Sequence, residues 1–350
     1  MGTPSASTSN DPSSSTPAGA AASDPKQAGR SSSGSEPRPG GSTAIVATAF
    51  GGPDGLAAVP VEIREPGPGE VTVQVRAAGV NPVDYKFYSG VYGKNAALLP
   101  MRLGREAAGV VTAVGGAGAL RVGDEVIVYG GGANGLYATD VTVPAGAVVP
   151  KPGELSWEIA AGLLLAGATA LHTLVATGVG VGDTVLVHGA AGSVGQLAVQ
   201  LAVRRGARVI GTAAPARHDQ LRAWGAEPVA YGPGLADRVR ALGAVTAAID
   251  TVGTDEAIDV SLELVADQVR IATVAGQGRA TGTGIKKLGG APGSDPGTEI
   301  RAHAWEELVP LAAKGELELV IARTFPLTEA AEAHRFVAEG HAGGKVILLP

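Results

Sequence analysis

The sequence VLVHGAAGSVGQLAVQ occupies positions 185–200 and is the strongest structural signal in the chain. An apolar run leads into glycines at 189, 192 and 195, and a second apolar run with helical spacing follows. Between a strand and a helix, such glycines permit a tight turn, close approach of the backbone to a pyrophosphate, and close helix–sheet packing. The helix N-terminus adds free N–H groups and a positive dipole end, which favour phosphate. We therefore predict a dinucleotide-binding loop with contacts from Gly189, Ala190, Ala191, Gly192, Ser193, Val194 and Gly195.

Two other interpretations of this loop stay open at this point. The glycines also suit a turn that joins a strand to a helix and binds nothing. In addition, residues 191–195 (AGSVG) nearly match the nucleophile elbow of α/β-hydrolases, with Ala191 where that motif has glycine. A serine hydrolase would use Ser193 as its nucleophile, with an acid and a histidine from later in the chain.

The residues after the next predicted strand indicate which dinucleotide is bound. An NAD-selective site usually has Asp or Glu there to bind the ribose 2′-hydroxyl. This chain has GTAAPAR at 211–217, without a carboxylate, and a guanidinium suits a 2′-phosphate. We therefore predict NADPH as the cofactor, with Thr212 and Arg217 as contacts. The alternative is that Arg217 is an ordinary solvated helix residue.

The pattern on either side predicts two kinds of domain. Around the glycine loop, apolar strands alternate with helices, which predicts a doubly wound parallel sheet of the Rossmann type. Its expected strands are 184–188, 207–211, 247–249 and 270–274. Before residue 152, short Val- and Ala-rich runs between turns predict a β-rich, barrel-like domain. Its expected strands are 44–50, 59–64, 71–80, 107–115, 125–129 and 137–143. A long apolar helix, 157–177, is expected between the two, with Ser156 as its N-cap and Gly178 after its end.

The amino-acid composition and the net charge exclude several kinds of sites and partners. The 350 residues contain no cysteine, which excludes disulfides, thiol nucleophiles and thiolate metal sites. The net charge of −6 and the 4% aromatic content argue against nucleic acid as a partner. We expect a cytoplasmic protein without membrane contact, since neither a signal peptide nor a spanning segment is indicated. Residues 1–42 contain twelve serines and six prolines and are expected to form a disordered tail.

Seven segments in order carry a family resemblance. They are AGVNPVD at 78–84, GREAAGVV at 104–111, GDEV at 123–126, AGATA at 166–170, the glycine loop, IDTVG at 249–253 and GKVIL at 344–348. With these segments the chain resembles the zinc-free medium-chain dehydrogenase/reductases, in the quinone oxidoreductase (zeta-crystallin-like) and enone reductase branch. The resemblance implies a GroES-like catalytic domain, 43–165 and 305–350, around a Rossmann NADPH-binding domain, 166–304. It also implies a homodimer.

The resemblance further implies catalytic candidates and no metal. Zinc relatives have a histidine ligand where this chain has Arg105, and the chain has only six scattered histidines. Lys86 stands where zeta-crystallin-like members have tyrosine, and it would bind the substrate carbonyl or a nicotinamide ribose oxygen. Tyr92 is a second candidate, and Asn81 would position Lys86 and the cofactor. The alternatives are a solvated Lys86 and an Asn81 that only caps a turn.

Further cofactor contacts are implied by position in the family pattern. They are Thr169, Tyr231, Thr251, Val252, Val274 and Ala275. The spacing before Tyr231 is one residue shorter than usual. His172 and His188 lie in apolar segments and are expected to be core groups rather than catalysts.

The expected activity is NADPH-dependent hydride transfer to a quinone or to the C=C bond of an α,β-unsaturated carbonyl compound, without zinc. The alternatives are a pathway-specific enoyl reductase of secondary metabolism and a non-catalytic NADPH-binding protein.

Overall fold

A computed structural model describes residues 2, 41–130, 132–340 and 342–350. The predicted tail, 1–42, lies outside the described residues except at positions 2, 41 and 42. The described residues from 41 onward fall in one unit of the chain, 38–350.

The predicted doubly wound sheet is confirmed as six parallel strands in the order β11-β10-β9-β12-β13-β14. The strands are β9 (Thr184–His188), β10 (Arg208–Thr212), β11 (Ala226–Val229), β12 (Ala247–Asp250), β13 (Ile271–Thr273) and β14 (Lys286–Lys287). From β9 the chain builds outward to β10 and β11, then returns to place β12 on the other side of β9. Open α/β sheets bind ligands where the order reverses in this way, at the carboxyl ends of the strands.

Helices connect these strands, as the alternation predicted. They are α3 (Ser193–Arg204), α4 (His218–Ala223), α5 (Leu235–Arg240) and α6 (Asp255–Leu264). Helix α3 packs against β9 and β10, with its apolar residues buried. The strands themselves are nearly continuous apolar runs, as expected for a parallel sheet covered on both faces.

The β-rich part contains two further sheets. A seven-stranded sheet has the order β15-β16-β3-β5-β6-β8, with β7 also paired to β3, and a three-stranded sheet has the order β2-β1-β4. The first contains β3 (Glu70–Val80), β5 (Glu106–Val114), β6 (Glu125–Tyr129), β7 (Asp140–Pro144), β8 (Val148–Pro150), β15 (Ile321–Pro326) and β16 (Lys345–Leu349). The second contains β1 (Ser42–Ala47), β2 (Leu56–Val61) and β4 (Met101–Arg102).

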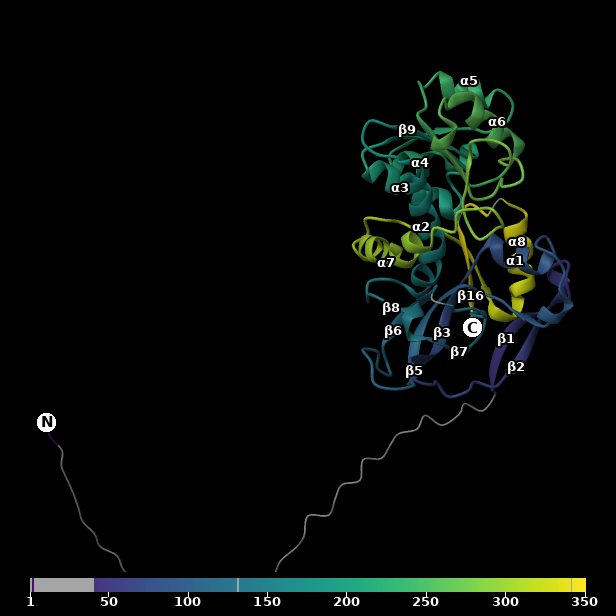
Figure 1. The fold of residues 1–350 in the computed structure, drawn as a ribbon, viewed down its shortest axis with the longest axis vertical. Coiled ribbons are helices and arrows are strands. Elements are labelled where there is room, and N and C mark those ends of the chain that lie inside the picture. The colour runs from purple at the N-terminus through teal and green to yellow at the C-terminus, as the bar shows by residue number, and fades with distance from the viewer. Residues whose placement is uncertain (1, 3–40, 131, 341) are drawn as a thin grey trace, which may run out of the picture. The chain divides into compact units, whose positions relative to one another are not determined.

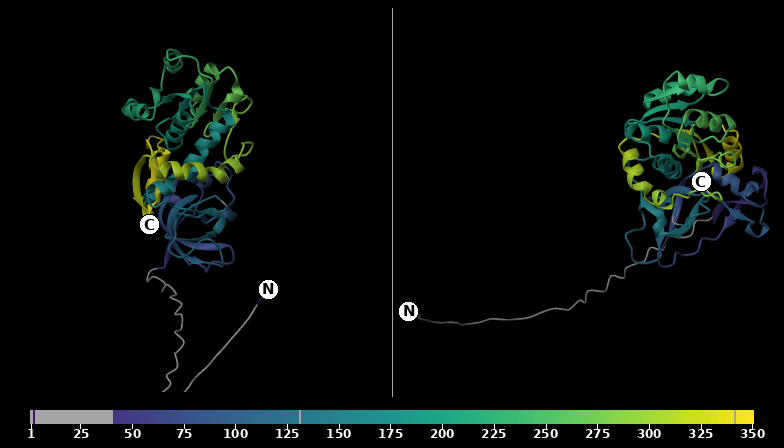
Figure 2. Two further views of the ribbon diagram at one scale, coloured as in Figure 1. Left: turned by 90° about the vertical axis from the view of Figure 1, so that its left-hand side faces the viewer. Right: turned by 45° about the horizontal axis from the view of Figure 1, so that its top comes forward.

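The C-terminal segment completes this β-rich part. Strand β16 pairs antiparallel with β3, with Val346 opposite Val80, and helix α8 (Ala330–Ala338) packs near α1 (Pro82–Ser89). Figure 1 shows β16 and α8, in yellow, among the blue and purple N-terminal elements. Figure 2 shows the same yellow segment against those strands in two other orientations.

Helix α2 (Trp157–Thr177) confirms the prediction in its bounds and caps. The Ser156 hydroxyl accepts a hydrogen bond from the Ile159 N–H at 3.3 Å, and Gly178 ends the helix with φ +65°. By length and composition α2 could cross a membrane, but 78% of its most apolar window is buried within the protein. It packs against β3 and β5 on one side and against α3 and α7 (Thr298–Ala313) on the other. The domain boundaries predicted after residues 165 and 304 fall inside α2 and α7, so both helices run through them.

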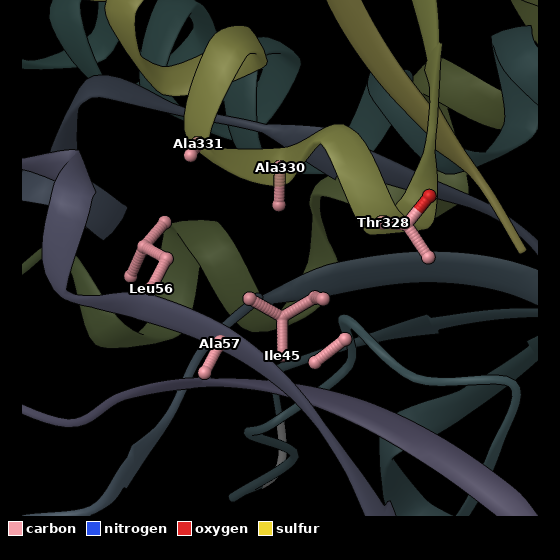
Figure 3. A pocket seen from close by; sticks show the side chains of 7 residues that line it. Ile45, Leu56, Ala57, Thr328, Ala330 and Ala331 are labelled. Carbon is pink, nitrogen blue, oxygen red and sulfur yellow. The ribbon is translucent and has the colours of Figure 1, made fainter.

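A small apolar pocket marks the contact between the N- and C-terminal segments. In Figure 3, Ile45, Leu56 and Ala57 line one side, and Ala330 and Ala331 line the other. Its volume of about 20 Å³ is close to that of one water probe, so it is a packing gap rather than a ligand site.

Candidate functional site

The glycine loop joins β9 to α3 at the carboxyl edge of the parallel sheet. Gly189 has φ +71°, and a Cβ there would lie 2.6 Å from Val252 Cγ1. A Cβ on Gly195 would overlap the carbonyl oxygen of Gly189, so the missing side chain lets α3 approach the loop. The Gly189 N–H donates to Thr212 Oγ1 at 3.1 Å, and the Ala190 N–H donates to the Thr212 carbonyl at 2.9 Å. The strand–turn–helix geometry is present, and two of its glycines are sterically required.

The first turn of α3 has no side-chain cap. Its N-cap residue is Gly192, in an extended conformation, and the Ser193 hydroxyl donates to the Gly344 carbonyl oxygen at 3.0 Å. The first N–H groups of a helix have no acceptor within the helix. Those of Ser193, Val194 and Gly195 are therefore directed, with the helix dipole, toward any anion at this end. This arrangement fits the pyrophosphate of a dinucleotide.

The surroundings of Ser193 do not support the serine hydrolase interpretation. Among the described residues no histidine is hydrogen-bonded to its hydroxyl, which is bonded to Gly344 instead. The nearest histidine in sequence, His188, has Nε2 3.1 Å from Ser261 Oγ, which itself donates to the Ala257 carbonyl. Burial lowers the pKa of His188 to about 4, so it is a neutral core group. Among the described residues, no histidine is placed to act as a general base for Ser193.

The loop after β12 lies against the glycine loop. The Thr251 hydroxyl donates to the His188 carbonyl at 2.7 Å, and Val252 is about half exposed above Gly189. Buried Asp250 fixes this loop, because its Oδ1 accepts hydrogen bonds from the N–H groups of Val252 and Gly253. Two predicted cofactor contacts, Thr251 and Val252, therefore lie beside the glycine loop.

The loop after β13 is fixed through the same carboxylate. The Thr273 hydroxyl donates to Asp250 Oδ2 at 2.6 Å and accepts from the Ala275 N–H at 3.2 Å. The Val274 N–H donates to the Asp250 carbonyl at 3.1 Å. Val274 and Ala275 thus lie at the adjacent strand end, as predicted. The sequence analysis did not single out Asp250 or Thr273, although a charged residue that ends an apolar strand is a usable signal.

Arg217 is the first cation in the sequence after the end of β10. It is half-buried, lies against Gly343, and forms no ion pair with any residue that the structure describes. Thr212 is buried, and no carboxylate side chain stands between it and Arg217. Tyr231 is 50% exposed, and its predicted role near the ribose stays a prediction.

A buried charged cluster that the sequence analysis missed lies between β3, β5 and β16. Lys345 Nζ donates to Glu106 Oε1 and to Asn81 Oδ1, both at 2.5 Å, and Asn81 Nδ2 donates to Glu106 Oε1 at 3.0 Å. Glu106 Oε2 accepts from the Leu165 N–H of α2 at 2.8 Å. All three side chains are buried. Glu106 and Lys345 were quoted only as parts of motifs, and charged residues inside apolar strands were the available signal.

Asn81 therefore has a structural role besides being the N-cap of α1. Its side chain belongs to this cluster, and its backbone N–H donates to Asp84 Oδ2 at 2.9 Å, at the start of α1. The Tyr137 hydroxyl donates to the same Asp84 oxygen at 2.7 Å. Burial raises the pKa of Asp84 to about 6, although these two hydrogen bonds and nearby Lys345 and Arg105 oppose the shift.

Lys86 and Tyr92 lie on α1 and just after it. Lys86 is half-buried, and burial lowers its pKa. Its ammonium group has no hydrogen bond or ion pair with another described residue, and its carbonyl oxygen accepts from the Ser89 hydroxyl at 2.9 Å. Tyr92 is 45% exposed and packs its ring 5.6 Å from that of Phe87. A cavity of about 330 Å³ beside α1 is lined by Asp84 and Phe87, and not by Lys86, Tyr92 or Asn81.

Thr169 lies one helical turn beyond the Glu106 contact of α2. Its hydroxyl donates to the Leu165 carbonyl at 2.7 Å and accepts from Arg301 Nη1 of α7 at 2.8 Å. Burial raises the pKa of Tyr129, on β6, and the nearby Arg301 opposes this shift. His172, also on α2, is buried with Nε2 3.2 Å from Asp295 Oδ2, and burial lowers its pKa. The sequence did not indicate Arg301.

Metal ligands are not gathered anywhere in the part of the chain that the structure describes: no group of three or more His, Cys, Asp or Glu side chains there could hold an ion.

Comparison with known proteins places this geometry in a family. Residues 67–153 match the alcohol dehydrogenase GroES-like domain, and residues 224–348 match the zinc-binding dehydrogenase family model. A quinone oxidoreductase of Pseudomonas aeruginosa is 34% identical over 322 residues, covering 86% of this chain and 98% of that protein.

Solved structures of similar proteins support the same family assignment. A quinone oxidoreductase of Escherichia coli complexed with NADPH superposes with a TM-score of 0.77 at 27% identity, covering 88% of this chain and all of that one. The CurK enoyl reductase superposes with a TM-score of 0.74 at 25% identity, covering 88% of this chain and 99% of that one. The chain therefore belongs to the medium-chain dehydrogenase/reductases, in the zinc-free quinone oxidoreductase branch.

Proposed function

We propose that the protein is an NADPH-dependent reductase of quinones or of the C=C bond of α,β-unsaturated carbonyl compounds. The observation that carries the proposal is the uncapped first turn of α3 beside the glycine loop, with Arg217 beyond β10 and no carboxylate between them. An oxidoreductase is what the family supports, and the cofactor and the acceptor are the proposed part. When bound, NADPH supplies a hydride to an electron-poor carbon of the acceptor.

The chain's own residues would bind and orient the two reactants. The N–H groups of Ser193 and Val194 bind the pyrophosphate, and Arg217 binds the 2′-phosphate, because it is a half-buried cation that has no carboxylate partner among the described residues. Thr169, Thr251 and Val274 hold the nicotinamide end against the strand ends. Lys86 stabilises the negative charge that develops on the acceptor's carbonyl oxygen, which is usually a large part of catalysis in a site shielded from water.

A second candidate is a pathway-specific enoyl reductase. The likeness to the CurK enoyl reductase supports it, and the glycine loop and Arg217 would have the same roles. Only the acceptor differs, so a substrate panel separates the two candidates. We also propose that the protein is a homodimer and works in the cytoplasm. Light scattering of the purified full chain measures the oligomeric state.

The decisive experiment follows the loss of reduced nicotinamide absorbance with NADPH or NADH against benzoquinones, naphthoquinones, enones and enoyl thioesters. We expect NADPH to be oxidised only when an acceptor is present, and NADH to be used much less well. A fluorescence titration with NADPH runs in parallel. Binding without turnover on any acceptor would indicate a non-catalytic NADPH-binding protein, and equal use of NADH would contradict the role given to Arg217.

A further inference from the structure

The cavity of about 330 Å³ beside α1 has a mixed lining. Five of its ten lining residues are apolar: Phe87, Leu98, Pro100, Met101 and Leu103. Two arginines, Arg102 and Arg105, also belong to the lining. A volume of this size accommodates a small organic molecule. The apolar side chains suit a ring or an alkyl chain of a ligand. Such a ligand part does not account for the two charged arginines in the lining.

Neither arginine is neutralised by an ion pair among the described residues. Arg102 is exposed and donates only to the Gly135 carbonyl oxygen, at 3.3 Å. Arg105 is half-buried and places its guanidinium 4.3 Å from the centre of the Phe87 ring. A guanidinium has five N–H donors, and stacking on an aromatic ring leaves its edge free to donate. Both groups therefore keep donors available at the cavity.

Asp84, the only acid among the described lining residues, does not pair with either arginine. Asp84 Oδ2 accepts from the Asn81 N–H and the Tyr137 hydroxyl, and the field of Arg105 acts on Asp84 without a direct contact between them. The neighbouring Glu106 turns into the buried cluster, toward Lys345. Two guanidinium groups thus face one carboxylate that is already hydrogen-bonded, and the lining remains positive.

We propose that this cavity forms one part of the acceptor site, on the same helix α1 as Lys86, and that it selects acceptors carrying an anionic group, such as a carboxylate attached to the enone or quinone. This rests on the proposed reductase function, which it makes more specific. The carboxylate binds the edges of Arg102 and Arg105, and the carbon skeleton packs on Phe87 and Met101. Arginine pairs with carboxylates through two parallel hydrogen bonds, which fix orientation as well as affinity.

The test uses two acceptors that differ in one group, β-acetylacrylate and its methyl ester, at saturating NADPH. The ester lacks the negative charge but has the more electron-poor C=C bond, so a preference for the acid does not come from intrinsic reactivity. We expect kcat/KM to favour the acid by about tenfold or more, as hydrogen bonds to charged groups provide. Arg102→Met and Arg105→Met should each reduce this preference, mainly through KM. Arg76→Met is the matched control, because Arg76 is exposed on β3 away from the cavity and should leave the acid-to-ester ratio unchanged.

A binding measurement keeps the cavity proposal separate from the activity. Levulinate and methyl levulinate lack the reducible C=C bond, and calorimetry with the full chain compares their affinities. Preference for levulinate that Arg105→Met removes supports the anion site, even where no acceptor is turned over and the reductase proposal fails. Equal affinity for acid and ester in the wild type, or a preference that survives in both arginine variants, overturns the anion site while leaving the reductase proposal intact.

Discussion

Lys345 Nζ lies 2.5 Å from Glu106 Oε1, and neither side chain is exposed to solvent. The two residues are 239 positions apart, on β16 and β5, with β3 between them in the sheet. The other carboxylate oxygen of Glu106 accepts from the Leu165 N–H, so the pair also ties α2 to the β-rich part. Strand β16 therefore contacts the N-terminal strands through a buried ion pair with β5 as well as through backbone hydrogen bonds with β3.

Lys345→Met should lower the free energy of unfolding by about 3–5 kcal/mol, because it leaves the Glu106 carboxylate buried without its cation. Urea unfolding followed by circular dichroism measures this. Adding Glu106→Gln to Lys345→Met removes the uncompensated charge and should restore part of the loss.

Arg204→Met provides the matched control for this pair. Arg204 and Glu316 form an ion pair with side chains 42% and 45% exposed. Its loss should cost less than about 1 kcal/mol. A loss in Lys345→Met no larger than in Arg204→Met would show that the buried pair adds little to stability.

The local features of this fold were predictable from sequence, because neighbouring residues determine them. The glycine loop, the Ser156 cap and the Gly178 end of α2 all depend on residues a few positions apart. Strands β4 and β14 have two residues each and carry no periodicity, so they depend entirely on pairing with distant strands. Prediction of short strands fails for this reason.

The candidate site also contains some features that neighbouring residues determine and others that depend on contacts between distant segments. The glycine loop between β9 and α3 was predicted from its spacing, whereas the Glu106–Lys345 pair and the Arg301–Thr169 hydrogen bond join residues more than a hundred positions apart. No local pattern specifies which distant side chain satisfies a buried charge. The role of Arg217 was predicted from the local sequence after β10, whereas the role of Lys86 was implied by the family resemblance.

Arg217→Met should weaken NADPH binding by about 10- to 100-fold and leave NADH binding nearly unchanged. The reason is that only NADPH has a 2′-phosphate, to which the Arg217 guanidinium would donate a charged hydrogen bond. Fluorescence titration with both nucleotides gives the two dissociation constants. Arg222→Met is the control: Arg222 lies further along on α4 and pairs with Asp219 at the surface. Equal weakening of NADPH and NADH binding by Arg217→Met would argue against 2′-phosphate recognition.

Lys86→Met should lower kcat by about 100-fold, the usual effect of removing one donor to a developing oxyanion. Burial lowers the pKa of Lys86, so its positive charge, and the activity that needs it, should decline on the alkaline side at a lower pH than for an exposed lysine. The variant should lack this alkaline decline. Lys94→Met changes an exposed lysine nearby and should retain both kcat and the pH profile. An unchanged kcat in Lys86→Met would remove this residue from the acceptor's oxygen.

A buried histidine makes the stability of the β-rich part depend on pH. His334 of α8 is buried, with Nδ1 2.8 Å from the Tyr88 hydroxyl of α1. Burial lowers the pKa of His334 to about 4, against about 6.5 in an unfolded chain. The unfolded state therefore binds a proton in this interval that the folded state does not bind. The His334 contribution is complete above about pH 6.5 and is lost as the pH falls toward 4.

His334→Gln should flatten the decline in unfolding free energy between about pH 6.5 and 4, by about 1.4 kcal/mol per pH unit relative to the wild type. Glutamine keeps a polar partner for Tyr88 but does not titrate.

The comparison must be made between variant and wild type, because other buried groups titrate in the same interval. His188 acts in the same direction as His334, whereas Asp84, with its pKa raised to about 6, acts in the opposite direction. His303→Gln is the control, since His303 is exposed and its pairing with Glu306 raises its pKa, so its loss should not flatten the decline. Parallel pH profiles for His334→Gln and the wild type would mean that His334 is protonated equally in the folded and unfolded states.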